Sequence, residues 1–253
     1  MEVKEDLRLA LDDVAFAREL LGAEPDAWQA DLLRTRDAQQ VLLLCSRQAG
    51  KTSVAAIIAL RQALYHPRSL VLVLAPALRQ SQEFFKSVVS FYAALGRPTS
   101  AISEQKLFLE LSNGSRVVAL PGTEKTIRGF SGAAMLIVDE AARVADDLYY
   151  SVRPMLAVSG GSLMLLSTPW GKRGVFYEEW THGAGWRRYR VPAGMCPRIS
   201  PEFLEAERQR MPALWYGQEY LCEFHEAEDQ VFGHDDIQAA LDTDEEPLFG
   251  GSI

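Results

Sequence analysis

Four short apolar runs without polar interruption recur along the chain. They cover residues 41–45, 70–75, 135–138 and 163–167. Runs of this length without alternation predict strands buried on both faces, as in a parallel sheet covered by helices. A fifth segment, residues 187–191, alternates as a strand does and is predicted to be the last strand.

Segments with apolar residues at helical spacing separate these runs. This alternation is typical of an α/β fold with a mostly parallel sheet and helices on both faces. The first helical segment, residues 5–21, is predicted to be one helix. The other predicted helices cover residues 28–33, 50–64, 78–95, 201–210 and 213–222.

Two further apolar segments, residues 107–111 and 116–120, flank Asn113-Gly114, a dipeptide typical of tight hairpin turns. They predict a β-hairpin insertion. In open α/β sheets ligands bind beyond the carboxyl ends of the strands, so the residues that follow the apolar runs are the candidates for chemistry.

A candidate phosphate-binding loop lies between the first apolar run and the helix that follows. Its N–H groups and the helix N-terminus form an anion site, and Gly50 allows close backbone approach to a phosphate. Lys51 would place its charge between the β- and γ-phosphates, and the Thr52 hydroxyl would bind Mg²⁺. Cys45 stands where the usual pattern begins with glycine. An ordinary helix start with a surface lysine is the alternative.

Two adjacent acids, Asp139 and Glu140, end the third apolar run. Asp139 would hold Mg²⁺ and Glu140 would orient or activate the attacking water, the two roles that hydrolysis of a γ-phosphate requires. Arg47 would stabilise charge in the transition state, and Arg128 is a candidate arginine finger for a neighbouring subunit. A solvated strand end and solvent-facing loop arginines are the structural alternatives.

Three weaker signals complete the predicted site. Ser167 and Thr168 end the fourth run and would sense the γ-phosphate, although Ser-Thr-Pro is also common turn chemistry. An upstream glutamine can read adenine. The residues predicted to bind ATP are therefore Trp28, Gln29, Ser46, Arg47, Gln48, Ala49, Gly50, Lys51 and Thr52, and the candidate DNA contacts are Lys172, Arg173, Arg188 and Arg190.

Composition narrows the class of protein. Hydrophobic residues make up 48% and charged residues 24%, a globular balance, and no apolar run approaches the roughly 20 residues that cross a bilayer. The net charge of −8 counts against a surface that coats nucleic acid, although a local basic patch is compatible with it. Three widely spaced cysteines favour an intracellular protein with reduced thiols.

The motifs SRQAGKT, MLIVDE and LLSTP, with the upstream Trp28-Gln29, resemble the ATPase domain of the large terminase subunit of tailed bacteriophages. Terminase loops typically lack the leading glycine, which accounts for Cys45. The resemblance implies an ASCE/RecA-like P-loop NTPase that uses ATP and Mg²⁺ to package double-stranded DNA. It places Gln29 on the adenine motif and Ser167-Thr168 on the coupling motif. The implied partners are DNA, the portal of a procapsid, the small terminase subunit and further copies in a ring, with no membrane, in the host cytoplasm.

The resemblance also divides the chain. We expect an N-terminal helical region with the adenine motif, an ATPase core, a lid-like helical subdomain and a linker toward a nuclease domain that is absent, so that no nuclease activity is expected. Their ranges are residues 1–40, 41–200, 201–241 and 242–253.

Three alternatives stay open. One half of a superfamily 2 helicase would share Asp139-Glu140 but needs a second lobe. A nucleotide-gated assembly module that binds ATP without hydrolysis usually lacks the acid at Glu140. A small-molecule kinase would need an acceptor site, and none is evident in the sequence.

Overall fold

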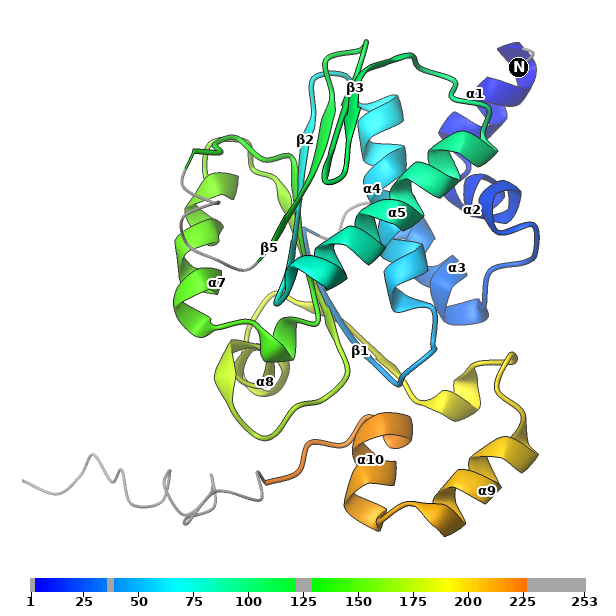
Figure 1. Ribbon diagram of the computed structural model, residues 1–253, viewed down its shortest axis with the longest axis vertical. Helices are drawn as coiled ribbons and strands as arrows, with labels where there is room; N and C mark the ends of the chain where they lie inside the picture. The colour runs from blue at the N-terminus through cyan, green and yellow to red at the C-terminus, as the bar shows by residue number, and fades with distance from the viewer. Residues whose placement is uncertain (1–2, 36–38, 122–128, 227–253) are drawn as a thin grey trace, which may run out of the picture.

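The strands form one eight-stranded sheet in the order β3-β4-β5-β2-β6-β7-β1-β8 (Figure 1). The computed structural model describes residues 3–35, 39–121 and 129–226. Pairing is parallel from β5 to β8 across the sheet, whereas β3, β4 and β5 pair antiparallel. The strands are β1 Gln40–Cys45, β2 Leu70–Ala75, β3 Ala101–Gln105, β4 Phe108–Leu111, β5 Arg116–Pro121, β6 Met135–Asp139, β7 Ser162–Ser167 and β8 Arg187–Val191.

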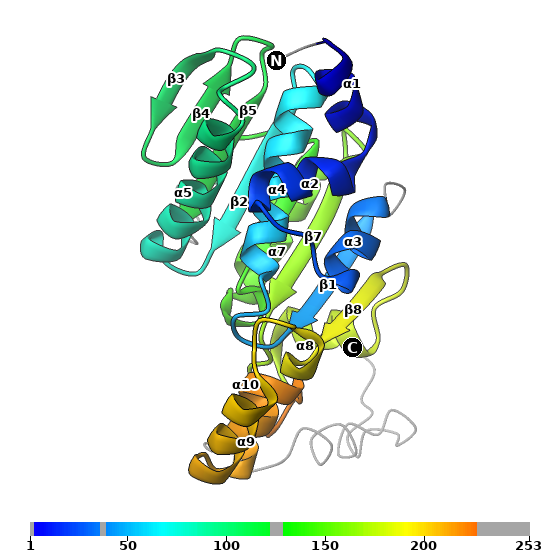
Figure 2. The same ribbon diagram turned by 90° about the vertical axis from the view of Figure 1, so that its right-hand side faces the viewer.

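Helices cover both faces of the sheet, which confirms the predicted α/β fold with a mostly parallel sheet between two helical layers (Figures 1 and 2). One face carries α2, α3, α4 and α5, and the other carries α7 and α8. The helices are α1 Val3–Leu11, α2 Asp13–Leu21, α3 Ala27–Arg34, α4 Lys51–Tyr65, α5 Leu78–Ala94, α7 Asp146–Val152, α8 Gly174–Thr181, α9 Pro201–Arg210 and α10 Ala213–Leu221. Short 3₁₀ helices are η1 Ala141–Arg143, η2 Arg153–Leu156 and η3 Ala193–Met195.

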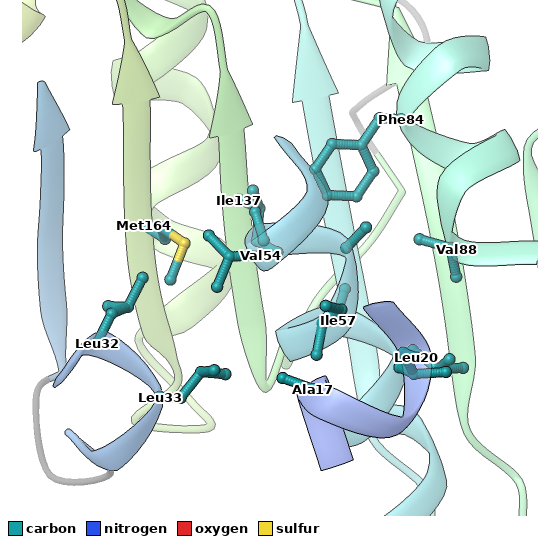
Figure 3. Packing of buried hydrophobic residues seen from close by; sticks show 14 of the residues in the cluster. Ala17, Leu20, Leu32, Leu33, Val54, Ile57, Phe84, Val88, Ile137 and Met164 are labelled. Carbon is teal, nitrogen blue, oxygen red and sulfur yellow. The ribbon is translucent and has the colours of Figure 1, made fainter. Parts of the chain in front are cut away.

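The alternation of side chains along each strand divides the core into two clusters. In β1, Leu43 belongs to the cluster under α2 to α5, whereas Leu42 and Leu44 belong to the cluster under α7 and α8. Figure 3 shows the first cluster, where Val54 and Ile57 of α4 lie among side chains of the strands and of the neighbouring helices. Because both faces are apolar, the strands read as unbroken apolar runs.

The predicted single helix over residues 5–21 is wrong, because α1 ends at Leu11 and α2 begins at Asp13. Asp12 separates them and caps α2: its Oδ1 accepts hydrogen bonds of 3.0 Å from the amides of Val14 and Ala15. An N-cap of this kind satisfies amides that have no partner inside the helix, which favours a new start over a continuous helix.

The hairpin prediction is confirmed by the antiparallel pairing of β4 and β5. Gly114 adopts φ +81° in the connecting turn, and the Asn113 amide donates a hydrogen bond of 2.8 Å to the Ala63 carbonyl. A further strand, β3, extends this end of the sheet and was not predicted. Within the described ranges, no helix has the length and apolar character needed to cross a membrane.

Candidate nucleotide site

Three strand ends bring the predicted site residues together at one edge of the sheet. β7 lies between β6 and β1 and pairs with both. The acids that end β6, the hydroxyls that end β7 and the loop that follows β1 therefore share this edge, as expected for parallel strands. The C-terminal helices α9 and α10 lie beyond the same edge (Figures 1 and 2).

The loop between β1 and α4 is fixed at its start by backbone hydrogen bonds and then lines a cavity. The amides of Ser46 and Arg47 donate to the carbonyls of Val191 and Glu219, at 2.9 and 3.0 Å. The following residues, 48–52, line a cavity of about 380 Å³. The loop bends through left-handed backbone at Gln48 (φ +59°) and at Gly50 (φ +87°). These bends and the N-terminus of α4 are the backbone features expected of an anion site, and phosphate binding by the loop stays a prediction.

Lys51 and Thr52 each lie against one of the two acids. Lys51 Nζ is 3.1 Å from Glu140 Oε1, and Thr52 Oγ1 donates a hydrogen bond of 3.3 Å to Asp139 Oδ2. A hydroxyl and a carboxylate side by side form a hard oxygen donor set of the kind that suits Mg²⁺ when phosphates and water complete it.

Burial and charge shift the pKa values of this group. Burial raises the pKa of Asp139 to about 6, with the neighbouring Glu140 charge adding to the effect. Burial also disfavours the charged form of Lys51, but the carboxylates of Glu140 and Asp139 outweigh it and raise its pKa. Lys51 is therefore a fixed cation at neutral pH, and Asp139 is a costly anion that a cation would stabilise.

The turn after β6 is held in an uncommon backbone conformation. Glu140 lies in the left-handed region, at φ +52° and ψ +43°, which is rare for a residue other than glycine. The Ala142 amide donates to Ser167 Oγ at 3.2 Å, so the end of β7 holds this turn. Ser167 is fully buried and Thr168 lines the cavity. Strain of this kind concentrates at functional sites.

Arg47 has a partner in the C-terminal helices. Its Nε lies 2.6 Å from Glu219 Oε2 on α10, in addition to the backbone hydrogen bond between the same residues. Arg47 and Gln48 also line a second cavity of about 490 Å³, whose other walls include Phe203 and Tyr220. The two cavities are therefore adjacent, with Arg47 at their boundary.

Gln29 is 3% exposed and braces the phosphate loop. Its Oε1 accepts from the Asp26 amide at 2.9 Å, and its Nε2 donates to the Gly50 carbonyl at 3.4 Å. Arg198 binds the Asp26 carboxylate through two hydrogen bonds of 2.6 and 2.8 Å and also reaches the Ala49 carbonyl at 3.2 Å. The reading of adenine by Gln29 stays a prediction, as does a nucleotide contact by Trp28, which lies in the core.

Most of the residues predicted to contact DNA bind other groups of the same chain. Arg188 donates to the carbonyls of Glu179 and Trp180 at the end of α8, and Arg190 donates to Leu221 at the end of α10. Basic side chains at helix C-termini satisfy carbonyls there. Lys172 pairs with Glu226 at 3.0 Å, and Arg173 is exposed.

Four residues of the site carry no motif in the sequence. Gln80 and Arg143 line the cavity at residues 48–52, and Arg198 and Glu219 bind the loop from outside that cavity. Arg143 follows Glu140 by three positions in the sequence, and this short spacing is the one local signal among the four residues. Arg128 and residues 242–253 lie outside the described residues, as does 227–241 of the predicted helical subdomain.

All three cysteines of the chain, Cys45, Cys196 and Cys222, are free and buried. Burial raises the pKa of the Cys45 thiol strongly, and it raises that of Cys222 to about 12. Cys45 thus packs as a small core residue at the end of β1, where burial favours its protonated thiol.

Comparison with known proteins gives a match over most of the chain. A family model described as "Terminase large subunit, T4likevirus-type, N-terminal" matches residues 42–239. The terminase large subunit of Thermus phage G20c is 28% identical over 273 residues, which covers 92% of this chain and 55% of that relative. The chain therefore spans about half the length of the curated relatives it matches.

Solved structures share the fold. The ATPase domain of the large terminase of Thermus phage P74-26 has a TM-score of 0.71 at 22% identity, over 82% of this chain and 97% of that chain. The large terminase of bacteriophage D6E in complex with ATP-gamma-S has a TM-score of 0.64 at 13% identity, over 79% of this chain and 52% of that chain.

Proposed function

The chain belongs to the phage terminase large-subunit family, and we propose that it is the ATP-hydrolysing motor domain that drives double-stranded DNA into a procapsid. The observation that supports this best is the convergence of Lys51 and Thr52 on Glu140 and Asp139, at 3.1 and 3.3 Å, around an anion-binding loop. A related large terminase was solved with ATP-gamma-S, which supports ATP as the ligand.

In this proposal the polyphosphate occupies the cavity lined by residues 48–52, and the base occupies the adjacent cavity beside Phe203 and Tyr220. Thr52 and Asp139 would hold Mg²⁺, which neutralises phosphate charge when bound.

Lys51 changes partners when a nucleotide binds. In the structure its charge is paired with Glu140, at 3.1 Å. A γ-phosphate offers Lys51 a stronger anion, which frees the Glu140 carboxylate to orient the attacking water and accept its proton. Arg47 would exchange its ion pair with Glu219 for a contact with the γ-phosphate, where it would stabilise the same negative charge.

The partners we propose are double-stranded DNA, the portal of the procapsid, the small terminase subunit and further copies of this chain in a ring, in the host cytoplasm. The four subdivisions of the chain and the trans-acting role of Arg128 belong to the same proposal. Three of the four residues predicted to contact DNA have partners within the chain, and their contacts with DNA stay a prediction.

Replacing Glu140 by glutamine tests the proposal. The amide keeps the size of the side chain but cannot accept a proton, so we expect kcat for ATP hydrolysis to fall by about 100-fold or more while ATPγS affinity is kept. Glu24→Gln, at an exposed partner of Arg18, is the control and should leave both unchanged. If Glu140→Gln still hydrolyses ATP at the wild-type rate, Glu140 does not activate the attacking water.

The rate of ATP hydrolysis per wild-type chain distinguishes the proposed motor from its alternatives. It is measured at increasing protein concentration, with and without DNA. A rate that rises with concentration and with double-stranded DNA supports a ring motor. Stimulation by single-stranded nucleic acid alone favours the helicase alternative, and tight binding without turnover favours an assembly module.

A further inference from the structure

The phosphate cavity carries a third cationic side chain besides Lys51 and Arg47. Arg143 lies in η1, directly after the catalytic acids, and lines the cavity together with Glu140 and Thr168. The sequence motifs assign it no role, and neither does the proposed mechanism.

The three cations differ in what holds them. Lys51 faces Glu140 at 3.1 Å and Arg47 faces Glu219 at 2.6 Å. Among the ion pairs of the described ranges, none involves Arg143; its guanidinium carbon instead lies 3.9 Å from the centroid of the Trp170 ring. Stacking on an aromatic face leaves the N–H donors at the rim of the guanidinium available to an anion.

The backbone fixes Arg143 at the end of the cavity that the proposed function assigns to the terminal phosphate. Its amide donates to the Glu140 carbonyl at 2.9 Å, and the preceding amide, of Ala142, donates to Ser167 Oγ at 3.2 Å. Arg47 lines both cavities and so marks the end near the base, whereas Glu140 and Arg143 line the phosphate cavity alone.

From this geometry, and resting on the proposed ATPase function, we propose that Arg143 binds the terminal phosphate in cis and that Trp170 is its positioning residue. Arg143 follows β6, and Trp170 follows the Ser167-Thr168 pair at which β7 ends. The contact therefore joins the two segments on either side of the γ-phosphate. Loss of that phosphate removes the anion from Arg143 and changes the environment of the Trp170 indole.

Nucleotide titrations of Arg143→Ala test the proposal. We expect the affinity for Mg²⁺·ATPγS to fall about tenfold, or about 1.4 kcal/mol, while the affinity for Mg²⁺·ADP changes less than about twofold, because ADP lacks the phosphate concerned. Arg143→Lys keeps the charge without the planar guanidinium. Its affinity for Mg²⁺·ATPγS should therefore lie between those of the wild type and Arg143→Ala. The matched control is Arg153→Ala, which also removes an arginine stacked on an aromatic ring, that of Tyr149 at 5.6 Å, but lies outside the cavity lining.

Tryptophan fluorescence provides a readout that a merely structural role would not change. ATPγS should alter the emission of the wild type more than ADP does. The difference should disappear in Trp170→Phe, which keeps the other four of the five tryptophans, and in Arg143→Ala. Trp170→Phe should also weaken ATPγS about two- to threefold, because phenylalanine is a poorer cation–π partner.

The outcomes separate this inference from the proposed function. If Arg143→Ala weakens ATPγS and ADP equally, or neither, while the wild type hydrolyses ATP, the role of Arg143 is refuted and the motor proposal stands. If the wild type binds ATPγS in preference to ADP through Arg143 but does not hydrolyse ATP, the inference stands and the motor proposal fails. A wild type that binds neither nucleotide overturns both.

Discussion

Replacing Asp139 by asparagine is expected to stabilise the metal-free protein while it abolishes Mg²⁺-dependent activity. Burial and the Glu140 charge raise the pKa of Asp139 from 3.8 to about 6, so folding penalises the ionised form. A shift of this size corresponds to about 3 kcal/mol at neutral pH. Burying the amide also has a cost, which leaves an expected net gain of about 1–2 kcal/mol in the free energy of unfolding.

The same shift fixes the pH dependence. Between pH 3.8 and about 6 the folded protein binds more protons at Asp139 than the unfolded chain does, so the contribution of this residue to stability falls as pH rises and is constant above about 6. The difference in stability between Asp139→Asn and the wild type should therefore grow across this window. About half of the effect should be present at pH 5.

Urea denaturation in EDTA at pH 5 and at pH 7.5 measures this difference. Asp12→Asn is the control: backbone amides hold the pKa of that exposed carboxylate below its usual value, so its loss should destabilise slightly. A variant at Asp139 that is less stable than the wild type at pH 7.5, or a difference independent of pH, would refute the reasoning. With EDTA replaced by Mg²⁺·ATPγS, the wild type should gain more stability than the variant, because the ligand binds only the folded state.

Two further predictions concern the surroundings of the loop. Arg198→Ala should cost about 1–2 kcal/mol of unfolding free energy in urea, because the buried Asp26 carboxylate loses its bidentate partner; a loss no larger than that of Arg208→Ala, whose pair with Glu205 is exposed, would contradict this. Tyr220→Ala should weaken ATPγS about tenfold in calorimetric titrations and leave tripolyphosphate binding unchanged, since Tyr220 lines only the cavity assigned to the base. Equal weakening of both ligands would place the base elsewhere.

The parts of the fold that the sequence predicts correctly are those with local signals. The strands that end at Cys45, Asp139 and Ser167 are apolar runs because both faces of the sheet are covered. The break at Asp12 also had a local signal, since an aspartate before an apolar helical segment is a common N-cap. By contrast, β3 is mostly exposed and has no apolar alternation, so no periodicity marked it.

Local sequence patterns could not predict ion pairs between residues that meet only in the folded chain. Asp26 and Arg198 are 172 residues apart, and nothing in either segment indicates that they meet under the phosphate loop. The pairing of Arg47 with Glu219 depends in the same way on where α10 lies. The sequence supplies the residue types of the site, whereas the ion pairs that restrain them depend on how the C-terminal helices are placed.

The burial of every cysteine has a practical consequence for labelling. Thiolates are the reactive species, and the native thiols are inaccessible and disfavoured as thiolates in the case of Cys45 and Cys222. A cysteine placed at an exposed position such as Val158, which is 88% exposed, is expected to react alone with a maleimide dye while the native protein serves as its own blank. Probes can thus be attached one at a time to the intact chain, without first removing any native thiol, and movements between its segments can be followed during turnover.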